Sequence, residues 1–207
     1  MSKHHYTYLA LGDSYTVGES VPLHESFPYQ TVQLLRKAGY HFHAPEIIAK
    51  TGWTSSELAE QLLHTKLNES YDYVSLLIGV NNQYRGLSID EFKTDLEFLI
   101  RKAIHLSGEK PNHVIVISIP DWGVTPFAAK KDGKKISEEI DAFNIICESA
   151  ANQFKTQFIN ITEETRKAKK DPTLLAEDHL HYSAKEHLIW AEKVVALIKA
   201  IFKHIES

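Results

Sequence analysis

The chain has few of the residues that mark several large classes of protein. Its 207 residues include a single cysteine, Cys147, so no disulfide can form within the chain. Cys147 lies in the segment AFNIICESAANQF, where helical spacing puts it on one apolar face with Phe143 and Ile146. We therefore expect Cys147 to be a small residue of the hydrophobic core.

Positive charge and long apolar runs are also scarce. The chain has 23 lysines and arginines against 27 acidic residues, which leaves no excess of positive charge to neutralise a nucleic acid backbone. No segment approaches the roughly 20 apolar residues of a membrane-spanning helix, and the N-terminal MSKHHYTYLALGDS lacks the apolar core of a secretory signal. These features predict a cytoplasmic protein that has no membrane span and does not bind nucleic acid.

The sequence shows no internal repeat, low-complexity tract or linker, and its length suits one well-buried core, so we expect a single domain over residues 1–207. Five short apolar runs alternate with longer amphipathic segments, a pattern typical of parallel strands joined by crossover helices. The strand candidates are YTYLALG, PEIIAK, YVSLLIG, HVIVISI and QFINIT, and the helical patterns cover residues 28–38, 55–64, 89–106, 137–154 and 184–204. The pattern predicts an α/β fold with an open, doubly wound sheet and helices on both faces.

Local signals refine this expectation. Capping boxes are predicted at three helix starts: Thr54 with Glu57, Ser88 with Glu91, and Ser183 with Glu186. The one strongly polar break, FAAKKDGKKISEE, follows the fourth strand and contains a turn signal at Asp132-Gly133, so we expect a solvated loop there. A further hypothesis is that the four lysines of this loop flank the ligand crevice and favour anionic substrates; they are Lys130, Lys131, Lys134 and Lys135.

Polar residues gather where the predicted strands end, which is where ligands bind in open α/β sheets. The segments are GDSYT, TGWTS, GVNNQYRG, PDWG and, before the final helix, EDHLHYS. Ser14 in the first of them could be a helix cap, a phosphate contact or a nucleophile. Asp178 lies three residues before His181, so its carboxylate can accept from one imidazole nitrogen while the other faces Ser14. A serine with such a base nearby can act as a nucleophile, which predicts a triad of Ser14, Asp178 and His181.

Acyl transfer also requires hydrogen-bond donors for the oxyanion of the tetrahedral intermediate. The Ser14 N–H, the Gly52 N–H and the Asn81 side chain follow three separate strands and are candidates for this role. Aromatic residues follow the strand ends as well, and they either belong to the core or wall a pocket for an acyl group or a sugar. These candidates for substrate binding are Tyr15, Trp53, Tyr84 and Trp122, together with Phe127.

Four of these segments resemble the blocks of the SGNH or GDSL hydrolase family, and in particular its lysophospholipase-like members. The segments are GDSYT, Gly52 within KTGWTSSEL, GVNN and DHLHYS, in the family's order. The resemblance implies a flavodoxin-like, three-layer α/β/α fold and hydrolysis of esters or thioesters through a serine acyl-enzyme, without metal or organic cofactor. It makes Ser14 the nucleophile, His181 the base, Asp178 its orienting carboxylate, and Ser14, Gly52 and Asn81 the oxyanion donors. One departure is visible, because Asn82 stands where the family usually has aspartate.

Other functions fit parts of the sequence. A non-catalytic, hydrolase-like module could hold a carbohydrate or lipid in the same crevice. A phosphate or nucleotide binder could use GDSYTVGES, but that loop has neither G-x-x-x-x-G-K nor G-x-G-x-x-G. His179, His181 and His187 suggest a metal, yet no His-Glu-x-x-His or cysteine pair accompanies them, so we expect no metal site. The prediction is therefore a serine esterase for small ester substrates. Short acyl esters, acetylated carbohydrates, lysophospholipids and thioesters all remain candidate substrates. The sequence does not indicate the oligomeric state.

Overall fold

The structure is a computed structural model that describes residues 4–206. Its centre is a five-stranded sheet in the order β2-β1-β3-β4-β5, and all four strand pairings are parallel. The strands are β1 (Tyr8–Gly12), β2 (Glu46–Ala49), β3 (Tyr73–Leu77), β4 (Val114–Ile117) and β5 (Gln157–Ile159). The strand order reverses between β1 and β3, so the sheet is doubly wound and the predicted fold class is confirmed.

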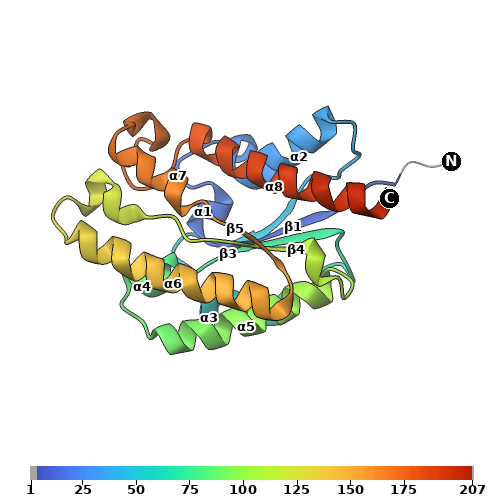
Figure 1. Cartoon of the computed structure of the whole chain (residues 1–207), viewed down its shortest axis with the longest axis horizontal. Coiled ribbons are helices and arrows are strands. Elements are labelled where there is room, and N and C mark those ends of the chain that lie inside the picture. Colours follow the sequence, from blue (N-terminus) through green and yellow to red (C-terminus); the bar gives the residue numbers. More distant parts are fainter. Residues whose placement is uncertain (1–3, 207) are drawn as a thin grey trace.

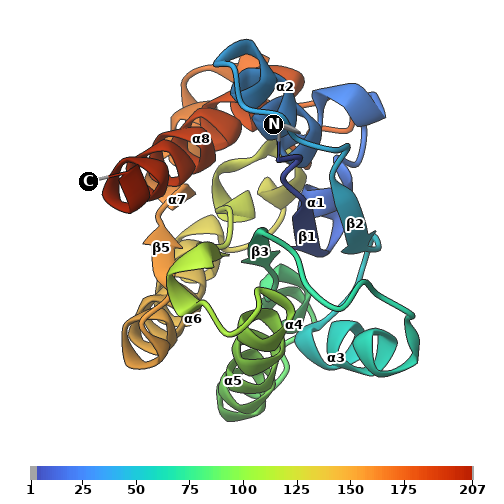
Figure 2. The ribbon, with the colours of Figure 1, turned by 90° about the vertical axis from the view of Figure 1, so that its right-hand side faces the viewer.

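Helices cover both faces of the sheet, so the fold has three layers: helices, sheet and helices (Figure 1). On one face α2 (Phe27–Lys37) packs against α8 (Ala184–Glu206). On the other face α5 (Ile89–Leu106) packs between α3 (Ser55–His64) and α6 (Gly133–Phe154), as Figure 2 shows. Short helices follow three of the strands: α1 (Ser14–Val17), α4 (Val80–Tyr84) and α7 (Thr162–Thr165). Single 3-10 turns complete the chain at Leu23–Glu25, Pro111–His113, Trp122–Val124, Pro126–Ala128, Arg166–Lys169 and Pro172–Leu174.

The burial of the strands explains their composition. Every residue of β1, β3 and β4 is buried, which is why these segments are almost uniformly apolar rather than alternating. Strands β2 and β5 form the edges of the sheet and are partly exposed. Cys147 is 1% exposed and belongs to the core, as predicted. Among the described residues, no helix is both long and apolar enough to cross a membrane.

The prediction of a loop around Asp132-Gly133 needs correction. The break around Asp132-Gly133 is the start of α6 rather than a turn in a loop, because the Asp132 side chain accepts a hydrogen bond from the Lys135 N–H at 3.0 Å and caps the helix. Lys134 and Lys135 therefore lie in the first turn of α6, and only the residues before Asp132 belong to the loop.

The capping boxes were predicted with mixed success. Thr54 and Glu57 form a complete box at the start of α3, whereas Ser88 only accepts from the Glu91 N–H. The box at Ser183 is wrong, since its hydroxyl donates to the Thr173 carbonyl and Glu186 accepts from the Trp190 indole N–H. Ser183 thus bonds a residue outside the helix and Glu186 bonds one a turn further along α8, and neither partner belongs to the capping pattern.

Candidate active site

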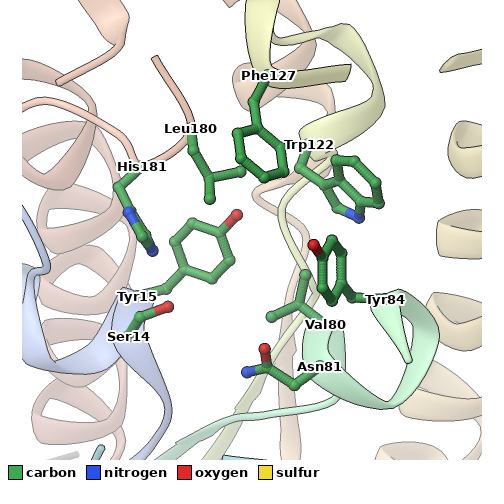
Figure 3. A pocket seen from close by; sticks show the side chains of 9 residues that line it. All are labelled: Ser14, Tyr15, Val80, Asn81, Tyr84, Trp122, Phe127, Leu180 and His181. Atoms are coloured by element: carbon green, nitrogen blue, oxygen red, sulfur yellow. The ribbon is translucent and has the colours of Figure 1, made fainter. Parts of the chain in front are cut away.

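A cavity of about 200 Å³ lies at the carboxyl ends of the strands. Residues from the loops after β1, β3 and β4 and from the segment before α8 converge there (Figure 3). The residues that line it are Ser14, Tyr15, Val80, Asn81, Tyr84, Trp122, Phe127, Leu180 and His181. None of these nine side chains is acidic, and most are apolar or aromatic.

Ser14 occupies a tight turn between β1 and α1. A Cβ on Gly12 would lie 2.1 Å from Thr16 Oγ1 and 2.4 Å from the Leu77 carbonyl oxygen, so only glycine fits at the end of the strand. Asp13 caps α1 through its side chain, which accepts from the Tyr15 N–H at 3.0 Å. Ser14 is then the first residue of the helix, and no described residue accepts a hydrogen bond from its N–H. The hydroxyl and the N–H of Ser14 therefore both lie at the carboxyl end of β1, beside the cavity.

Asp13 is next to Ser14 but does not line the cavity. Its side chain is fully buried, and burial raises its pKa from an ordinary value of 3.8 to about 7. Its carboxylate caps α1, which is a structural role.

His181 and Asp178 form a close pair at the cavity. His181 Nδ1 lies 2.6 Å from Asp178 Oδ2, and Asp178 Oδ1 accepts from the N–H groups of Leu180 and His181 at 3.0 and 2.9 Å. Burial alone would raise the pKa of Asp178, but these bonds outweigh it and hold that pKa well below its ordinary value. With Nδ1 bound to a carboxylate, the other nitrogen of the ring has no hydrogen-bond partner among the described residues, and Figure 3 shows the ring extending toward Ser14.

Sequence reasoning missed a third partner of this carboxylate. The Ser20 hydroxyl donates to Asp178 Oδ2 at 2.8 Å, although the two residues are 158 positions apart. Ser20 lies in the loop after α1 with a φ of 67°, in the left-handed region. No motif signals such a contact, because it depends on how that loop meets the segment before α8.

The candidate oxyanion donors Asn81 and Gly52 differ in their position relative to the cavity. Asn81 lines the cavity, and its Nδ2 donates to the Trp53 carbonyl at 2.9 Å. Gly52 is not among the lining residues; its φ is 86°, its carbonyl accepts from Arg85 Nη2 at 2.5 Å, and no described residue accepts from its N–H.

The expectation that Trp53 walls the pocket does not hold. Its side chain is absent from the described lining of the cavity, and its contribution is the backbone carbonyl that fixes Asn81.

An aromatic wall lies across the cavity from Ser14 and His181 (Figure 3). Tyr84 and Trp122 meet edge to face with ring centroids 5.3 Å apart, and Phe127 packs beside them. The Trp122 indole donates to Gln83 Oε1 at 2.7 Å, which fixes the ring in place. Tyr15 packs edge-on against the His181 ring, so four of the five aromatic candidates line the cavity.

Asn82 points away from the cavity. Its Oδ1 accepts from the Ser55 N–H at 2.9 Å and its Nδ2 is 2.8 Å from the Ser55 hydroxyl. The amide thus joins α4 to the start of α3, and the exchange of acid for amide changes these local bonds and leaves Asn81 in the cavity.

The histidines do not assemble into a metal site within residues 4–206, where no group of three His, Cys, Asp or Glu side chains is arranged to hold an ion. His187 is buried, and its Nδ1 accepts from the Phe27 N–H at 3.2 Å. Burial lowers the pKa of His187 to about 3, so it stays neutral beside the site.

The fold and the site together define a class of enzyme, the SGNH-type ester hydrolases of the α/β group. The model of the GDSL-like Lipase/Acylhydrolase family matches residues 10–188, which is most of the chain, and the protein belongs to this family. It is accordingly a hydrolase of the serine type that acts on ester bonds.

Three solved structures with the same fold are distant from this chain in sequence. TesA is 19% identical with a TM-score of 0.73, and the match covers 94% of this chain and 98% of that one. The acetylxylan esterase Axe2 from Geobacillus stearothermophilus is 18% identical with a TM-score of 0.74 and 95% of each chain covered. The esterase EstA from Pseudoalteromonas sp. is 16% identical with a TM-score of 0.71, covering 96% of this chain and 99% of that one. No significant match was found among curated protein sequences.

Proposed function

We propose that the protein is an esterase that cleaves small carboxylic esters with Ser14 as nucleophile, His181 as base and Asp178 as the carboxylate that orients the base. The observation that carries the proposal is the 2.6 Å contact between Asp178 and His181 at the rim of the cavity that Ser14 lines. A serine hydroxyl becomes an effective nucleophile when a neutral, oriented imidazole accepts its proton.

The reaction follows from these positions. Ser14 Oγ attacks the ester carbonyl carbon while the free nitrogen of His181 takes the hydroxyl proton. The C–O bond to the alcohol then breaks, the alcohol leaves with the proton from His181, and an acyl-enzyme on Ser14 remains. Water, activated by the same imidazole, attacks the acyl carbonyl, releases the carboxylic acid and restores Ser14.

Three donors serve the oxyanion that forms in each step. The N–H groups of Ser14 and Gly52 have no acceptor among the described residues, so they are available to a substrate oxygen. The Trp53 carbonyl holds one hydrogen of the Asn81 amide and so orients the second hydrogen for the same oxygen. Donors fixed before the reaction stabilise the developing charge without reorganisation.

The cavity favours a small substrate. Its volume of about 200 Å³ is below the roughly 300–1,000 Å³ of pockets for drug-sized ligands. Its apolar and aromatic lining suits a short acyl group or a compact alcohol better than a long lipid chain. The name of Axe2 gives acetylxylan as its substrate, which makes acetyl esters the first substrates to test.

Ser14→Ala tests the proposal directly. We expect hydrolysis of p-nitrophenyl acetate to fall by roughly 10⁴-fold or more, because the nucleophile is lost. A fluorophosphonate probe should label the wild-type protein once, at Ser14, as located by mass spectrometry. Ser137→Ala is the control, since Ser137 lies on α6 outside the cavity and should leave both turnover and labelling unchanged.

The rival proposal of a non-catalytic binding module predicts the opposite result. Such a module would bind an acetylated sugar without turnover and would not react with the probe. Full turnover by Ser14→Ala, or labelling at another serine, would overturn the esterase mechanism.

A further inference from the structure

We propose that Lys131 forms a subsite for a negatively charged group of the substrate, in a hollow that adjoins the cavity along Tyr84 and Trp122. The inference rests on the proposed esterase function and names the class of ester: one that carries a carboxylate or a phosphate group some distance from the ester bond.

The first observation is the position of the Lys131 ammonium. Its Nζ lies 5.5 Å from the centroid of the Tyr84 ring and 5.9 Å from that of the Trp122 ring. Both rings belong to the aromatic wall that faces Ser14 and His181 across the cavity (Figure 3). Lys131 lines an adjoining hollow that shares these two rings with the cavity, so a substrate group that extends from Ser14 past the rings reaches a positive charge.

The second observation is that this charge is not neutralised. Lys134 and Lys135 pair with Glu138 and Glu139, each at 3.7 Å, along the exposed face of α6. Among the described residues Lys131 has no carboxylate partner. Of the four lysines that the sequence suggested, Lys131 is the one whose ammonium lies near the aromatic wall without a described carboxylate partner.

Nearby acids are engaged elsewhere. Asp132 accepts from the Lys135 N–H as the cap of α6, and Glu139 accepts from Gln83 Nε2 at 2.7 Å besides its contact with Lys135. The cavity with Ser14 is lined by no acidic side chain, and the adjoining hollow holds both acids beside Lys131 and Lys135. Because Glu139 pairs with Lys135 and Asp132 caps α6, the Lys131 ammonium is the charge there that a substrate anion can pair with.

The environment of Lys131 suits recognition of an anion. The faces of aromatic rings attract a cation weakly at exposed sites, which holds the ammonium near the wall without consuming its three N–H donors. Carboxylate and phosphate oxygens accept such hydrogen bonds, and hydrogen bonds between charged groups are stronger than those between neutral groups.

Matched esters test the subsite on both sides of the scissile bond. For the acyl side, p-nitrophenyl hemisuccinate is compared with neutral p-nitrophenyl butyrate. For the alcohol side, 4-acetoxybenzoate and 4-acetoxyphenyl phosphate are compared with methyl 4-acetoxybenzoate. The quantity measured is the ratio of the KM of each anionic ester to that of its neutral partner, at low and at high salt.

We expect wild type to prefer at least one anionic ester, and Lys131→Gln to raise that KM ratio by about 3- to 10-fold, as for a partly exposed ion pair. High salt should weaken the preference of wild type more than that of the variant. Lys130→Gln is the matched control: it removes the same charge from the neighbouring exposed residue and should leave the ratio unchanged. The carboxylate and phosphate arms identify which anion the subsite takes.

Absence of any anionic preference in wild type, or equal loss of preference in both variants, would overturn the subsite. Neutral esters would still be cleaved in a Ser14-dependent manner in that case, so the subsite can fail while the esterase proposal stands. If wild type cleaved none of these esters in a Ser14-dependent manner, the esterase proposal itself would be refuted.

Discussion

At the scale of single residues, Asp178 is held by groups from two distant parts of the chain. Oδ1 accepts two backbone N–H groups, and Oδ2 accepts from both His181 Nδ1 and the Ser20 hydroxyl. The residues that fix Asp178 thus include one from the loop that follows α1, the short helix that begins at Ser14. We interpret Ser20 as a positioning residue that acts on the base through Asp178.

Ser20→Ala and Ser20→Gly separate the hydroxyl from the backbone. Both variants lose the bond to Asp178, so we expect kcat to fall roughly tenfold in each, as for a hydrogen bond to a charged group. Loss of a donor raises the pKa of Asp178, and the more basic carboxylate holds the proton on the neighbouring ring more firmly. The acid limb of kcat/KM should therefore move to higher pH in both variants.

The control is the difference between the two variants. Because φ of Ser20 is 67°, glycine fits the backbone better than alanine, and Ser20→Gly should have the higher Tm of the pair. Recovery of kcat and of the wild-type pH profile by glycine alone would mean that backbone strain, and not the hydroxyl, explains the effect.

The residues that motifs describe were predictable, and those that only the fold brings together were not. Ser14 and Asn81 each follow a strand end, His181 lies just before the final helix, and the structure gathers all three at one cavity. Ser20 and the Trp53 carbonyl act through contacts that depend on loop packing. The sequence motifs therefore identified the residues that meet at the cavity, whereas the contacts that hold those residues in place became visible only in the folded structure.

At the scale of elements, one polar chain links three helices beside the site. Asn82 of α4 binds both the N–H and the hydroxyl of Ser55 at the start of α3. The Ser55 hydroxyl in turn donates to Asp95 Oδ2 of α5 at 2.7 Å. The hydroxyl has one proton, which goes to Asp95, so the residue at position 82 must be a donor toward it.

Asn82→Asp tests this link. The aspartate could still accept from the Ser55 N–H, but its second oxygen would compete with Asp95 for the single hydroxyl proton. We expect a loss of about 1–3 kcal/mol in the free energy of unfolding at pH 8, the cost of a buried polar group without its partner. The favourable effect of a negative charge at the start of α3, about 0.3–1 kcal/mol, is smaller. Urea denaturation measures the difference.

The double variant Asn82→Asp with Asp95→Asn is the control. It restores one donor and one acceptor on either side of Ser55 and should regain most of the lost stability, whereas Asp95→Asn alone should not gain any. Equal stability of Asn82→Asp and wild type would show that the amide has no such role.

Element types were predictable because their periodicity reflects burial, but their boundaries depended on caps. The buried central strands were apparent from continuous apolar runs such as YLALG and VIVI. The start of α6 was misplaced because Asp132 acts as a cap there, and the box at Ser183 failed because Thr173 and Trp190 compete for its side chains.

At the scale of the whole molecule, Arg166 ties together the segments behind the aromatic wall. Its guanidinium donates to Asp121 beside Trp122 at 2.8 Å, to Asp141 of α6 at 2.6 Å and to Glu163 of α7 at 3.1 Å. Asp121 is fully buried, and its carbonyl also accepts from the Tyr182 hydroxyl. The layered architecture followed from the alternation of strands and helices, but this ion-pair network did not, since its members are scattered over the sequence.

Arg166→Met removes the cation and leaves Asp121 buried with one oxygen unpaired. We expect a loss of about 3–5 kcal/mol in the free energy of unfolding, the usual effect of breaking a buried ion pair from one side. Asp121→Asn in the same chain removes the buried charge while its Oδ1 can still accept from the Gly123 N–H, so the double variant should recover a large part of that loss. Urea denaturation of wild type, both single variants and the double variant closes the cycle. Simple additivity of the two single effects would contradict the network, because independent sites show no coupling energy.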